Sequence, residues 1–589
     1  MTPERSAAHS TEAPAGTAHA ATHTERPDEV RWQLRDAAGN DCRHLVDQLR
    51  IHPVTARVLV ARGWNTPALA GRFLDPNWSD ILDPSRLPDL DCAIARTVKA
   101  IRRGERIMII GDYDVDGLTA TAILSAAIRI AGGLVAWQIP HRLRDGYGMR
   151  EMHVDVASQQ GIRLIVTADS GIRSFSAIQH ANAAGIDVIV TDHHLPELHL
   201  PAALAIVNPT RRDSVYPNRN LCGAGIAYQF SVGLLRAIRA PEQRATAITR
   251  SLCKLAAIGT VADVVPLVGE NRAIVSLGLR CLADVRNPGL RALLDAVGIP
   301  PGRRPTTREI AFRLAPRINA AGRVENASLI MDLLSTHDRD IAESLVARVE
   351  KANDRRKAEQ ARVLKDIARQ ISCPDSESPV LVFSRPGWHR GVLGIVAARL
   401  VDQYGKPVFV LSEEAELAYG SGRSIPGVDL TGLLERTKQH LEAFGGHEQA
   451  AGLTIRTERI RAFHDDICAA CGDVHPARIL ELDSQLRLAD AARVWPEISR
   501  FEPFGNGNPD PIFGTRVRVA SPLIAARSGI WRINVEQDGR VFPLKNFGRT
   551  NGNGCLTPGE RVDLAYRLQH DTWRSEGFAF VLEAVRRAA

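Results

Sequence analysis

The sequence has 589 residues, of which 44% are hydrophobic and 24% charged, a globular composition long enough for about three to five domains. It excludes a membrane-spanning protein, because no apolar run reaches about 18 residues, and a disulfide scaffold, because the nine cysteines are an odd number scattered along the chain. The net charge of +7 favours a polyanionic partner, and the scattered cysteines favour a reducing cytoplasm.

The first 105 residues predict two different segments. Residues 1–30 are poor in large apolar side chains, so we expect a disordered tail. Residues 31–105 predict a mostly helical segment with breaks near Pro76 and Pro84.

From residue 106 to 270, short apolar runs alternate with helical stretches. This alternation indicates an α/β domain with a parallel sheet. The first expected helix covers residues 118–131, after the first strand and the acidic segment that follows it. The expected strands cover residues 106–110, 134–139, 162–166, 186–190 and 204–207.

Acidic and histidine motifs follow most of these predicted strands. They read Gly-Asp-Tyr-Asp-Val-Asp-Gly at 111–117, Thr-Ala-Asp-Ser-Gly at 167–171, Thr-Asp-His-His at 191–194 and Thr-Val-Ala-Asp at 260–263. Open α/β sheets bind ligands beyond the carboxyl ends of their strands, so we expect these side chains to meet. Crowded carboxylates are costly unless a counter-charge is present, which predicts a two-metal hydrolytic site. The candidate metal ligands are Asp112, Asp114, Asp116, Asp169, His193 and Asp263.

The residue types in these motifs bear on which metal they bind. Carboxylates with one or two imidazoles suit manganese, or magnesium with manganese preferred, better than zinc. Alternate residues of an extended chain share a face, so Asp112, Asp114 and Asp116 are expected to project together, with one of them free to cap a helix. A calcium loop is disfavoured because the glutamate at its twelfth position is missing. The sequence also lacks a phosphate-binding P-loop and a complete His-Glu-x-x-His zinc motif.

The second half predicts three further parts. Residues 271–375 predict connecting helices that end in a long charged helix from Asp338 to Gln370. Residues 376–475 predict a smaller α/β domain, which carries Trp388-His-Arg-Gly, Gly420-Ser-Gly-Arg-Ser and Gly445-Gly-His-Glu-Gln-Ala-Ala-Gly. Short strands and glycine-rich turns over 476–589 are typical of an OB-like, nucleic-acid-binding β-barrel.

Several of these motifs resemble a known family. The motifs at 111–117, 191–194, 221–225 (Leu-Cys-Gly-Ala-Gly) and 259–263 resemble the DHH phosphoesterase superfamily. The motifs of residues 376–475, with Leu-Ala-Pro-Arg-Ile-Asn-Ala-Ala-Gly-Arg at 314–323, resemble its single-stranded-DNA-specific exonucleases, which carry a DHHA1 domain. Pro-Phe-Gly-Asn-Gly-Asn-Pro at 503–509 fits as well. The resemblance covers about residues 45–585, and Ser170 departs from it, standing where Cys or Asn is common.

The resemblance implies a role for each matching residue. Asp114, together with Asp112, would serve one metal ion; Asp116, His193 and Asp263 would hold the other, and Asp169 would bridge both. His194 would contact the scissile phosphate, and Asp192 would orient the histidines. Trp388 would either stack on a base or fill the core, and Gly420-Ser-Gly-Arg is interpreted as a turn that recognises a 5′ end. The candidates for DNA or phosphate binding are Arg142, Arg317, Asn319, Arg323, Ser421, Arg423, Gly445, Gly446 and His447.

The resemblance therefore implies a 5′→3′ exonuclease that degrades single-stranded DNA to mononucleotides, using two divalent ions, in DNA repair and recombination. Single-strand-binding protein and a RecQ-type helicase are expected partners. One alternative is a DHH phosphodiesterase for short oligonucleotides or cyclic dinucleotides, which the predicted barrel disfavours. Another is a DHH-derived scaffold that binds DNA without cutting, which the complete ligand set disfavours.

Overall fold

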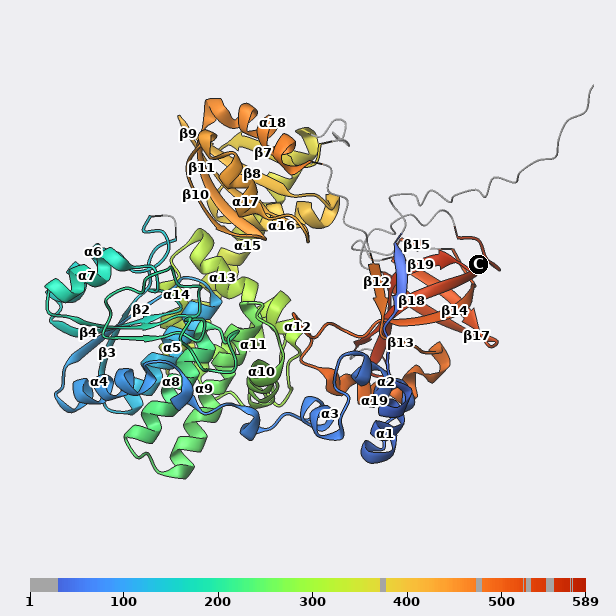
Figure 1. The fold of residues 1–589 in the computed structure, drawn as a ribbon, viewed down its shortest axis with the longest axis horizontal. Coiled ribbons are helices and arrows are strands. Elements are labelled where there is room, and N and C mark those ends of the chain that lie inside the picture. Colours follow the sequence, from blue (N-terminus) through green and yellow to red (C-terminus); the bar gives the residue numbers. More distant parts are fainter. Residues whose placement is uncertain are drawn as a thin grey trace, which may run out of the picture.

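The structure is a computed structural model. Its described residues are 30–142, 144–370, 378–472, 479–522, 524–525, 531–546, 556–571, 574 and 576–588. The tail predicted for residues 1–30 therefore lies outside the described residues, except for Val30. Figure 1 shows a large α/β lobe, a smaller α/β lobe beside it and a β-barrel with its own helices. The predicted α/β fold with an OB-like barrel is confirmed.

The large lobe is built on a five-stranded parallel sheet with the order β3-β2-β4-β5-β6. Its central strands are almost completely buried, as expected for a parallel sheet covered on both faces. Helices α4, α5, α8 and α9 share the core on one face, and α6 and α7 share the core on the other. The strands are β2 (Arg106–Gly111), β3 (Leu134–Gln138), β4 (Ile162–Ala168), β5 (Asp187–Thr191) and β6 (Ala205–Val207), and the helices are α4 (Leu90–Arg102), α5 (Val115–Ile130), α6 (Glu151–Gln159), α7 (Phe175–Ala183), α8 (Gly223–Ala237) and α9 (Glu242–Ala262).

The acidic segment after β2 differs from the prediction. The three aspartates were expected along an extended chain, but α5 already begins at Val115. Asp114 is the N-cap of α5, where its carboxylate accepts a hydrogen bond from the Gly117 amide (3.0 Å), and Asp116 lies in the first turn. A Cβ at residue 117 would lie 2.7 Å from the backbone nitrogen of Asp112, so this tight turn requires glycine.

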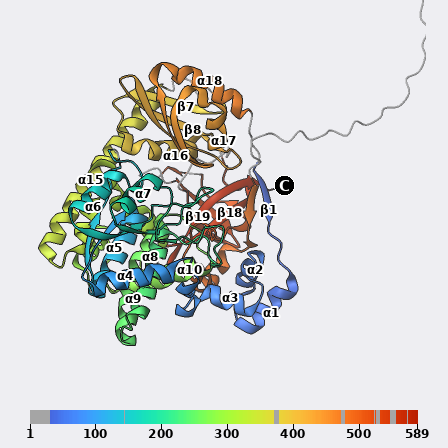
Figure 2. The ribbon, with the colours of Figure 1, turned by 60° about the vertical axis from the view of Figure 1, so that its left-hand side comes forward.

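Helices α10 to α15 connect the two α/β lobes. The longest, α15, packs against α11 and α13 and then reaches α16 of the small lobe, as Figures 1 and 2 show. The residues between α12 and α13 form a short π-helical segment, Ile310–Leu314. The connecting helices are α10 (Gly269–Cys281), α11 (Pro288–Ala296), α12 (Thr307–Glu309), α13 (Ala315–Val324), α14 (Ser328–Ser335) and α15 (Arg339–Gln370).

The small lobe contains a mixed sheet with the order β10-β11-β9-β8-β7. Only β7 and β8 pair in parallel, and the other neighbours are antiparallel. Its elements are β7 (Leu381–Pro386), α16 (Leu393–Tyr404), β8 (Val408–Glu414), β9 (Leu417–Arg423), α17 (Leu430–Arg436), β10 (Leu441–His447), β11 (Ala450–Arg456) and α18 (Ile460–Cys471).

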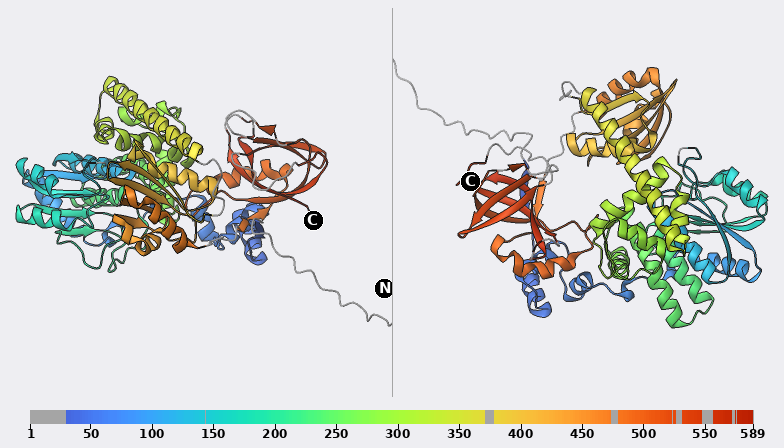
Figure 3. Two further views of the ribbon diagram at one scale, coloured as in Figure 1. Left: turned by 90° about the horizontal axis from the view of Figure 1, so that it is seen from above. Right: turned by 180° about the vertical axis from the view of Figure 1, so that it is seen from behind.

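The barrel and the N-terminal helices form one unit. Pairing of β14 with β16 closes the barrel, and β1 (Arg31–Leu34) pairs in parallel with β12 (Ile479–Leu482), more than 400 residues away. Apolar side chains of α1 (Gly39–Leu49), α2 (Pro53–Ala61) and α3 (Pro67–Leu74) share a core with the barrel, beside which they lie in Figure 3. The barrel strands are β14 (Phe513–Val519), β16 (Trp531–Gln537), β17 (Arg540–Asn546), β18 (Arg561–His570) and β19 (Phe578–Arg587). Among the described helices, none combines the length and apolarity that crossing a membrane requires.

A buried arginine joins the large lobe to this barrel unit. Arg272 on α10 is 2% exposed, and its guanidinium lies 3.8 Å from the ring centroid of Phe73 on α3. Burial lowers the pKa of Arg272 to about 9. The carbonyl groups that accept hydrogen bonds from its guanidinium belong to Phe73, Arg500, Phe501, Glu502 and Pro503. The side chain of one helix of the large lobe therefore satisfies backbone groups of α3 and of the segment before the barrel, all in the barrel unit.

Replacement of Arg272 is expected to weaken the contact between the large lobe and the barrel unit. Arg272→Met should lower the free energy of unfolding by about 2–4 kcal/mol, because buried carbonyls lose their donors. Arg280→Met is the control, since Arg280 lies on the same helix and makes an exposed ion pair with Asp75; it should cost at most about 1 kcal/mol. Urea unfolding followed by circular dichroism measures both. Equal urea midpoints for the two variants would contradict the role of Arg272 in holding the large lobe and the barrel unit together.

Candidate metal centre

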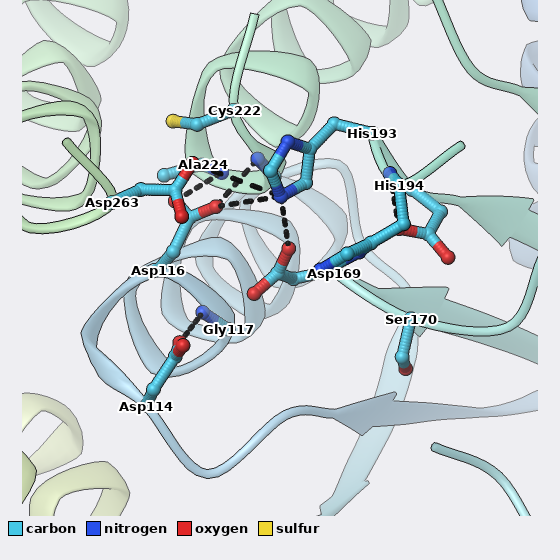
Figure 4. A network of polar contacts seen from close by, with 12 residues as sticks. Asp114, Asp116, Gly117, Asp169, Ser170, His193, His194, Cys222, Ala224 and Asp263 are labelled. Atoms are coloured by element: carbon cyan, nitrogen blue, oxygen red, sulfur yellow. Dashed lines mark hydrogen bonds and ion pairs between the residues drawn. The ribbon is translucent and has the colours of Figure 1, made fainter. Parts of the chain in front are cut away.

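The predicted acidic and histidine residues meet at one edge of the parallel sheet (Figure 4). Asp112 follows β2, Asp169 follows β4, and His193 and His194 follow β5, as expected from the carboxyl ends of parallel strands. Asp263 is positioned by a different element, because it is the C-cap of helix α9 and does not follow a strand.

His193 lies at the middle of the first group of potential ligands. Its Nε2 atom is 3.1 Å from Asp169 Oδ1, 3.7 Å from Asp263 Oδ2 and 3.9 Å from Asp116 Oδ2, and Figure 4 shows these side chains pointing toward one another. Ligand atoms of Asp116, His193 and Asp263 all lie within 4.8 Å of one another. This spacing allows the three side chains to share one ion.

A second group of potential ligands lies beside the first. Ligand atoms of Asp112, Asp114 and Asp169 also lie within 4.8 Å of one another. Asp169 contacts His193 of the first group as well, so it stands between the two. Its backbone has a φ of +61°, a conformation uncommon for residues other than glycine. The geometry thus has two adjacent places for a cation and one carboxylate that reaches both.

The start of helix α8 fixes the carboxylate of Asp116. The backbone amides of Gly223 and Ala224 donate to its two oxygens at 2.6 and 2.8 Å. The positive end of a helix dipole stabilises a carboxylate at this position. A Cβ at residue 223 would lie 2.6 Å from the Cβ of Asp169, so glycine is needed there. The Leu-Cys-Gly-Ala-Gly motif includes these residues, but the sequence did not predict that they contact Asp116.

The described residues at this site fit divalent cations. Burial first, and neighbouring carboxylates second, raise the pKa values of Asp112 and Asp169 well above their usual range and that of Asp263 to about 9. Buried atoms of four side chains make no hydrogen bond within the described part of the chain: Asp112 Oδ1, Asp169 Oδ1, His193 Nε2 and Asp263 Oδ2. Cations among these atoms would satisfy them and keep the carboxylates ionised, and oxygen ligands with one imidazole suit Mn²⁺ or Mg²⁺.

The pKa values of the two neighbouring histidines shift in opposite directions. Asp192 accepts hydrogen bonds from the His194 ring at 2.7 Å and from the Ile172 amide at 3.0 Å. Burial opposes the charge of His194, but the hydrogen bond and charge of Asp192 outweigh it and raise the pKa of His194 to about 9. Burial, followed by the charge of His194, lowers the pKa of His193. At neutral pH His193 is therefore a neutral potential ligand and His194 a cationic hydrogen-bond donor.

Three predicted phosphate-binding arginines come from separate segments and lie close together. Arg142 lies over the Tyr113 ring (4.7 Å), Arg323 on α13 donates to the Gly391 carbonyl (3.1 Å), and Arg423 on β9 donates to Ser421 Oγ (3.1 Å). Burial, then the charges of Arg142 and Arg423, lower the pKa of Arg323 to about 9. We call Arg142, Arg323 and Arg423 the arginine cluster. It spans both α/β lobes, and its member Arg142 acts to lower the pKa of Asp112 against the larger effect of burial.

Other predicted phosphate-binding residues are engaged elsewhere or exposed. Arg317 pairs with Glu350 of α15, and the Asn319 side chain accepts a hydrogen bond from the Val115 amide at the start of α5 (3.2 Å). Gly445, Gly446 and His447 lie on exposed strand β10. Gly445 of β10 pairs with Gly452 of β11, and Gly452 pairs in turn with Ser421 of β9. The two glycine-rich motifs of the small lobe therefore lie side by side in the sheet.

The structure decides two sequence interpretations of the small lobe: the turn is wrong, and the second of the two alternatives for Trp388 is confirmed. Gly420-Ser-Gly-Arg forms the end of strand β9 and not a turn. Trp388 is 2% exposed and its indole nitrogen donates to Asp366, so it fills the core and does not offer a face to a base.

Comparison with known proteins covers all three parts of the chain. Family models match residues 106–260 (DHH family, N-terminal domain), 377–473 (DHHA1 domain) and 482–579 (RecJ OB domain). The single-stranded-DNA-specific exonuclease RecJ of Bacillus subtilis is 32% identical over 93% of this chain and 69% of its own length. That of Escherichia coli is 32% identical over 89% of this chain and 93% of its own length. The chain belongs to the RecJ family.

Solved RecJ structures agree with this assignment. The crystal structure of RecJ from Thermus thermophilus in complex with Mn²⁺ has a TM-score of 0.82 and 29% identity, covering 95% of this chain and 80% of that one. A complex of the same protein with Mg²⁺ gives a TM-score of 0.76, with 28% identity over 96% of this chain and 79% of that one. The predicted resemblance is thus confirmed, and the metals of these RecJ structures are the two expected from the ligand types.

One residue beside the site was not predicted from the sequence. The Tyr147 hydroxyl donates to the Asp169 carbonyl (3.1 Å) and lies 2.9 Å from His194 Nδ1. It connects a potential bridging ligand with the cationic histidine. The loop before α6 that carries Tyr147 has no motif, so nothing in the sequence signals this contact.

Asp192 is expected to control the charge of His194. In Asp192→Asn the pKa of His194 should fall from about 9 by more than about one unit, because the hydrogen bond and the charge that oppose burial most strongly are lost while only the weaker effects of Asp263 and Asp114 remain. The wild-type ring stays charged up to about pH 9, whereas the variant ring should lose its charge at a lower pH. NMR titration of ¹³C-labelled histidines in chelator measures this.

His180, which pairs with Asp155 on the surface, provides an internal control that should not shift. A His194 pKa that stays within about half a unit of the wild-type value would exclude Asp192 as the cause.

Proposed function

We propose that this protein is a metal-dependent exonuclease that degrades single-stranded DNA in the 5′→3′ direction to mononucleotides, in DNA repair and recombination. The observation that carries the proposal is the place of Asp169, which forms one ligand group with Asp112 and Asp114 and another with His193 and His194, beside a cluster of arginines from two lobes. Membership of the RecJ family and the OB domain before the C-terminal end support DNA as the substrate.

The proposed chemistry assigns each residue a task. Asp116, His193 and Asp263 would hold one divalent ion, Asp112 and Asp114 the other, and Asp169 both. Such a pair of ions, when bound, activates water and stabilises the charge that develops on the phosphoryl group.

Two further residues would act on the phosphate without holding an ion. The cationic His194 ring would donate a hydrogen bond to a phosphate oxygen, and Asp192 would fix its orientation and charge. The amides of Gly223 and Ala224 would keep Asp116 ionised and in place.

The small lobe would recognise the 5′ end. Arg423 and Ser421 are adjacent side chains on β9, and the paired donors of a guanidinium match a terminal phosphate. A Cβ at residue 394 would lie 2.9 Å from the Arg423 guanidinium and 3.0 Å from Ser421 Oγ, so glycine leaves room for both. The arginine cluster would attract the doubly charged terminal phosphate more strongly than an internal diester.

The barrel would bind the rest of the strand. Trp531 on β16 is 37% exposed, and an exposed aromatic face suits a stacked base. This barrel favours long strands over the short oligonucleotides of other DHH phosphodiesterases. We further infer that the protein acts in the cytoplasm and meets single-strand-binding protein and a RecQ-type helicase on the same DNA.

Loss of the shared carboxylate should abolish cleavage. Asp169→Ala should lower the rate on a 5′-labelled single strand with Mn²⁺ by about three orders of magnitude or more, while affinity for DNA in chelator stays near wild type. Asp187→Ala is the control, since Asp187 begins β5 at the opposite end of the strand from His193. Wild-type protein should release labelled mononucleotides first and leave double-stranded DNA uncut. Activity of Asp169→Ala within tenfold of wild type would contradict the shared-ligand assignment.

Arg423 should select the chemistry of the 5′ end. Arg423→Ala is expected to lose the preference in kcat/KM for 5′-phosphate over 5′-hydroxyl ends, and Arg423→Lys to recover part of it, because lysine lacks paired donors. Arg456→Ala is the control, as Arg456 lies on neighbouring β11 in an exposed pair with Glu442. If Arg423→Ala keeps the wild-type preference ratio, end recognition belongs to other residues of the arginine cluster.

A further inference from the structure

A loop that precedes the barrel contacts the chain next to a proposed metal ligand. This loop, Pro503–Pro509, follows a short 3₁₀ turn at Ser499–Phe501, and we call it the PFGNGNP loop. It lies against residues 264–267, which directly follow Asp263. The two segments are about 240 residues apart in sequence.

Asn506 holds both ends of the 264–267 segment. Its side-chain amide donates to the Val264 carbonyl (2.8 Å), and its own carbonyl accepts from the Leu267 amide (2.7 Å). Glycines on either side permit this close approach. A Cβ at residue 505 would lie 2.8 Å from Leu267 Cδ1, and Gly507, with φ +71°, lies where a Cβ would be 3.1 Å from Pro266.

The segment held by Asn506 has a strained start. Val264 has a φ of +61°, which is unfavourable for a β-branched side chain and persists only where contacts enforce it. The Val264 side chain is 64% exposed, so core packing does not enforce this conformation. Asp263 is the C-cap of α9, and the strained residue is the next in the chain. The direction of the Asp263 carboxylate therefore depends on how the following peptide is held.

The PFGNGNP loop is itself firmly anchored. Asn508 is 3% exposed, and its side-chain amide donates to the carbonyls of Phe501 and Pro503, both at 2.8 Å. Arg62 on the N-terminal helices donates to the Pro509 carbonyl (2.7 Å) and pairs with Asp483. Asn506 thus extends from a rigid part of the barrel unit toward the metal centre.

We propose that Asn506 is a positioning residue for Asp263, through which the DNA-binding barrel unit sets the affinity of one metal site. The inference rests on the proposed role of Asp263 as a ligand of the ion shared with Asp116 and His193. Asn506 fixes the Val264 peptide, and this peptide fixes Asp263. Asp112 and Asp114, which would hold the other ion, make no hydrogen bond with the PFGNGNP loop among the described residues, so this loop should not affect that site directly.

Mn²⁺ titration of the full-length protein without DNA, with free Mn²⁺ followed by EPR, tests the inference. Asn506→Ala and the isosteric Asn506→Asp both remove the donor but keep the backbone acceptor for Leu267. Each should weaken one of two Mn²⁺ sites by about 3- to 10-fold and leave the other unchanged. Asn182→Ala is the matched control, since the Asn182 amide donates to a loop carbonyl of the same lobe at the same 2.8 Å; it should change neither site.

Kinetics separate positioning from general destabilisation. In both Asn506 variants kcat should fall at low Mn²⁺ and recover at high Mn²⁺, with the KM for DNA unchanged and a melting temperature within about 2 °C of the control. Two Mn²⁺ sites indistinguishable from those of Asn182→Ala would overturn the proposal. Equal weakening of both sites together with a lower melting temperature would also overturn it, because it would indicate a merely structural role.

Asp263→Ala distinguishes failure of this inference from failure of the ligand assignment. Loss of one Mn²⁺ site in Asp263→Ala, combined with unchanged Asn506 variants, overturns only the positioning role. Two intact sites in Asp263→Ala overturn the ligand assignment and the positioning role with it.

Discussion

Repulsion among carboxylates crowded at one edge of a parallel sheet is the constraint on which the rest of this structure depends. Five aspartates and His193 supply ligand atoms to two groups, each within 4.8 Å, and Asp169 and His193 form a third with His194. Asp112, Asp116 and Asp169 are buried, and the other ligands are partly exposed. Without a counter-charge, burial and mutual repulsion push protons onto Asp112, Asp169 and Asp263. Divalent ions reverse that balance, so metal binding and the ionised state of the site are one equilibrium.

Much of the surrounding architecture serves to hold these side chains against that repulsion. The amides at the start of α8 hold Asp116, Asn319 holds the start of α5, and Asp192 holds His194. Several of these contacts require glycine, because a side chain at Gly117 or Gly223 would collide with an aspartate. The small lobe adds Arg423 to cations of the large lobe, and α15 keeps the two lobes in contact. The proposed metal ligands thus all come from the large lobe, whereas the arginine cluster draws on both lobes.

The sequence predicted those features of the fold and the site that depend on local residue patterns. Strands β2 to β6 appear as apolar runs, and aspartates and histidines follow three of them, so the sheet edge could be assigned from the residue pattern alone. The extended arrangement predicted for Asp112, Asp114 and Asp116 is wrong because helix α5 already begins at Val115, whereas the helix cap expected for one of them is confirmed at Asp114. Gly420-Ser-Gly-Arg was misread as a turn because glycine favours turns locally, whereas here it leaves room between neighbouring strands.

Contacts between distant segments could not be predicted. The pairing of β1 with β12, the carbonyls around Arg272 and the contact of Asn506 with Val264 each join residues at least 199 positions apart. Asp263 also lies at a helix end, for which strand periodicity gives no signal.

Anomalous diffraction from crystals grown with Mn²⁺ tests the central claim most directly. The account predicts two anomalous peaks, one among Asp116, His193 and Asp263 and one beside Asp112 and Asp114, with Asp169 contacting both. A single peak, or two peaks of which neither contacts Asp169, would contradict it.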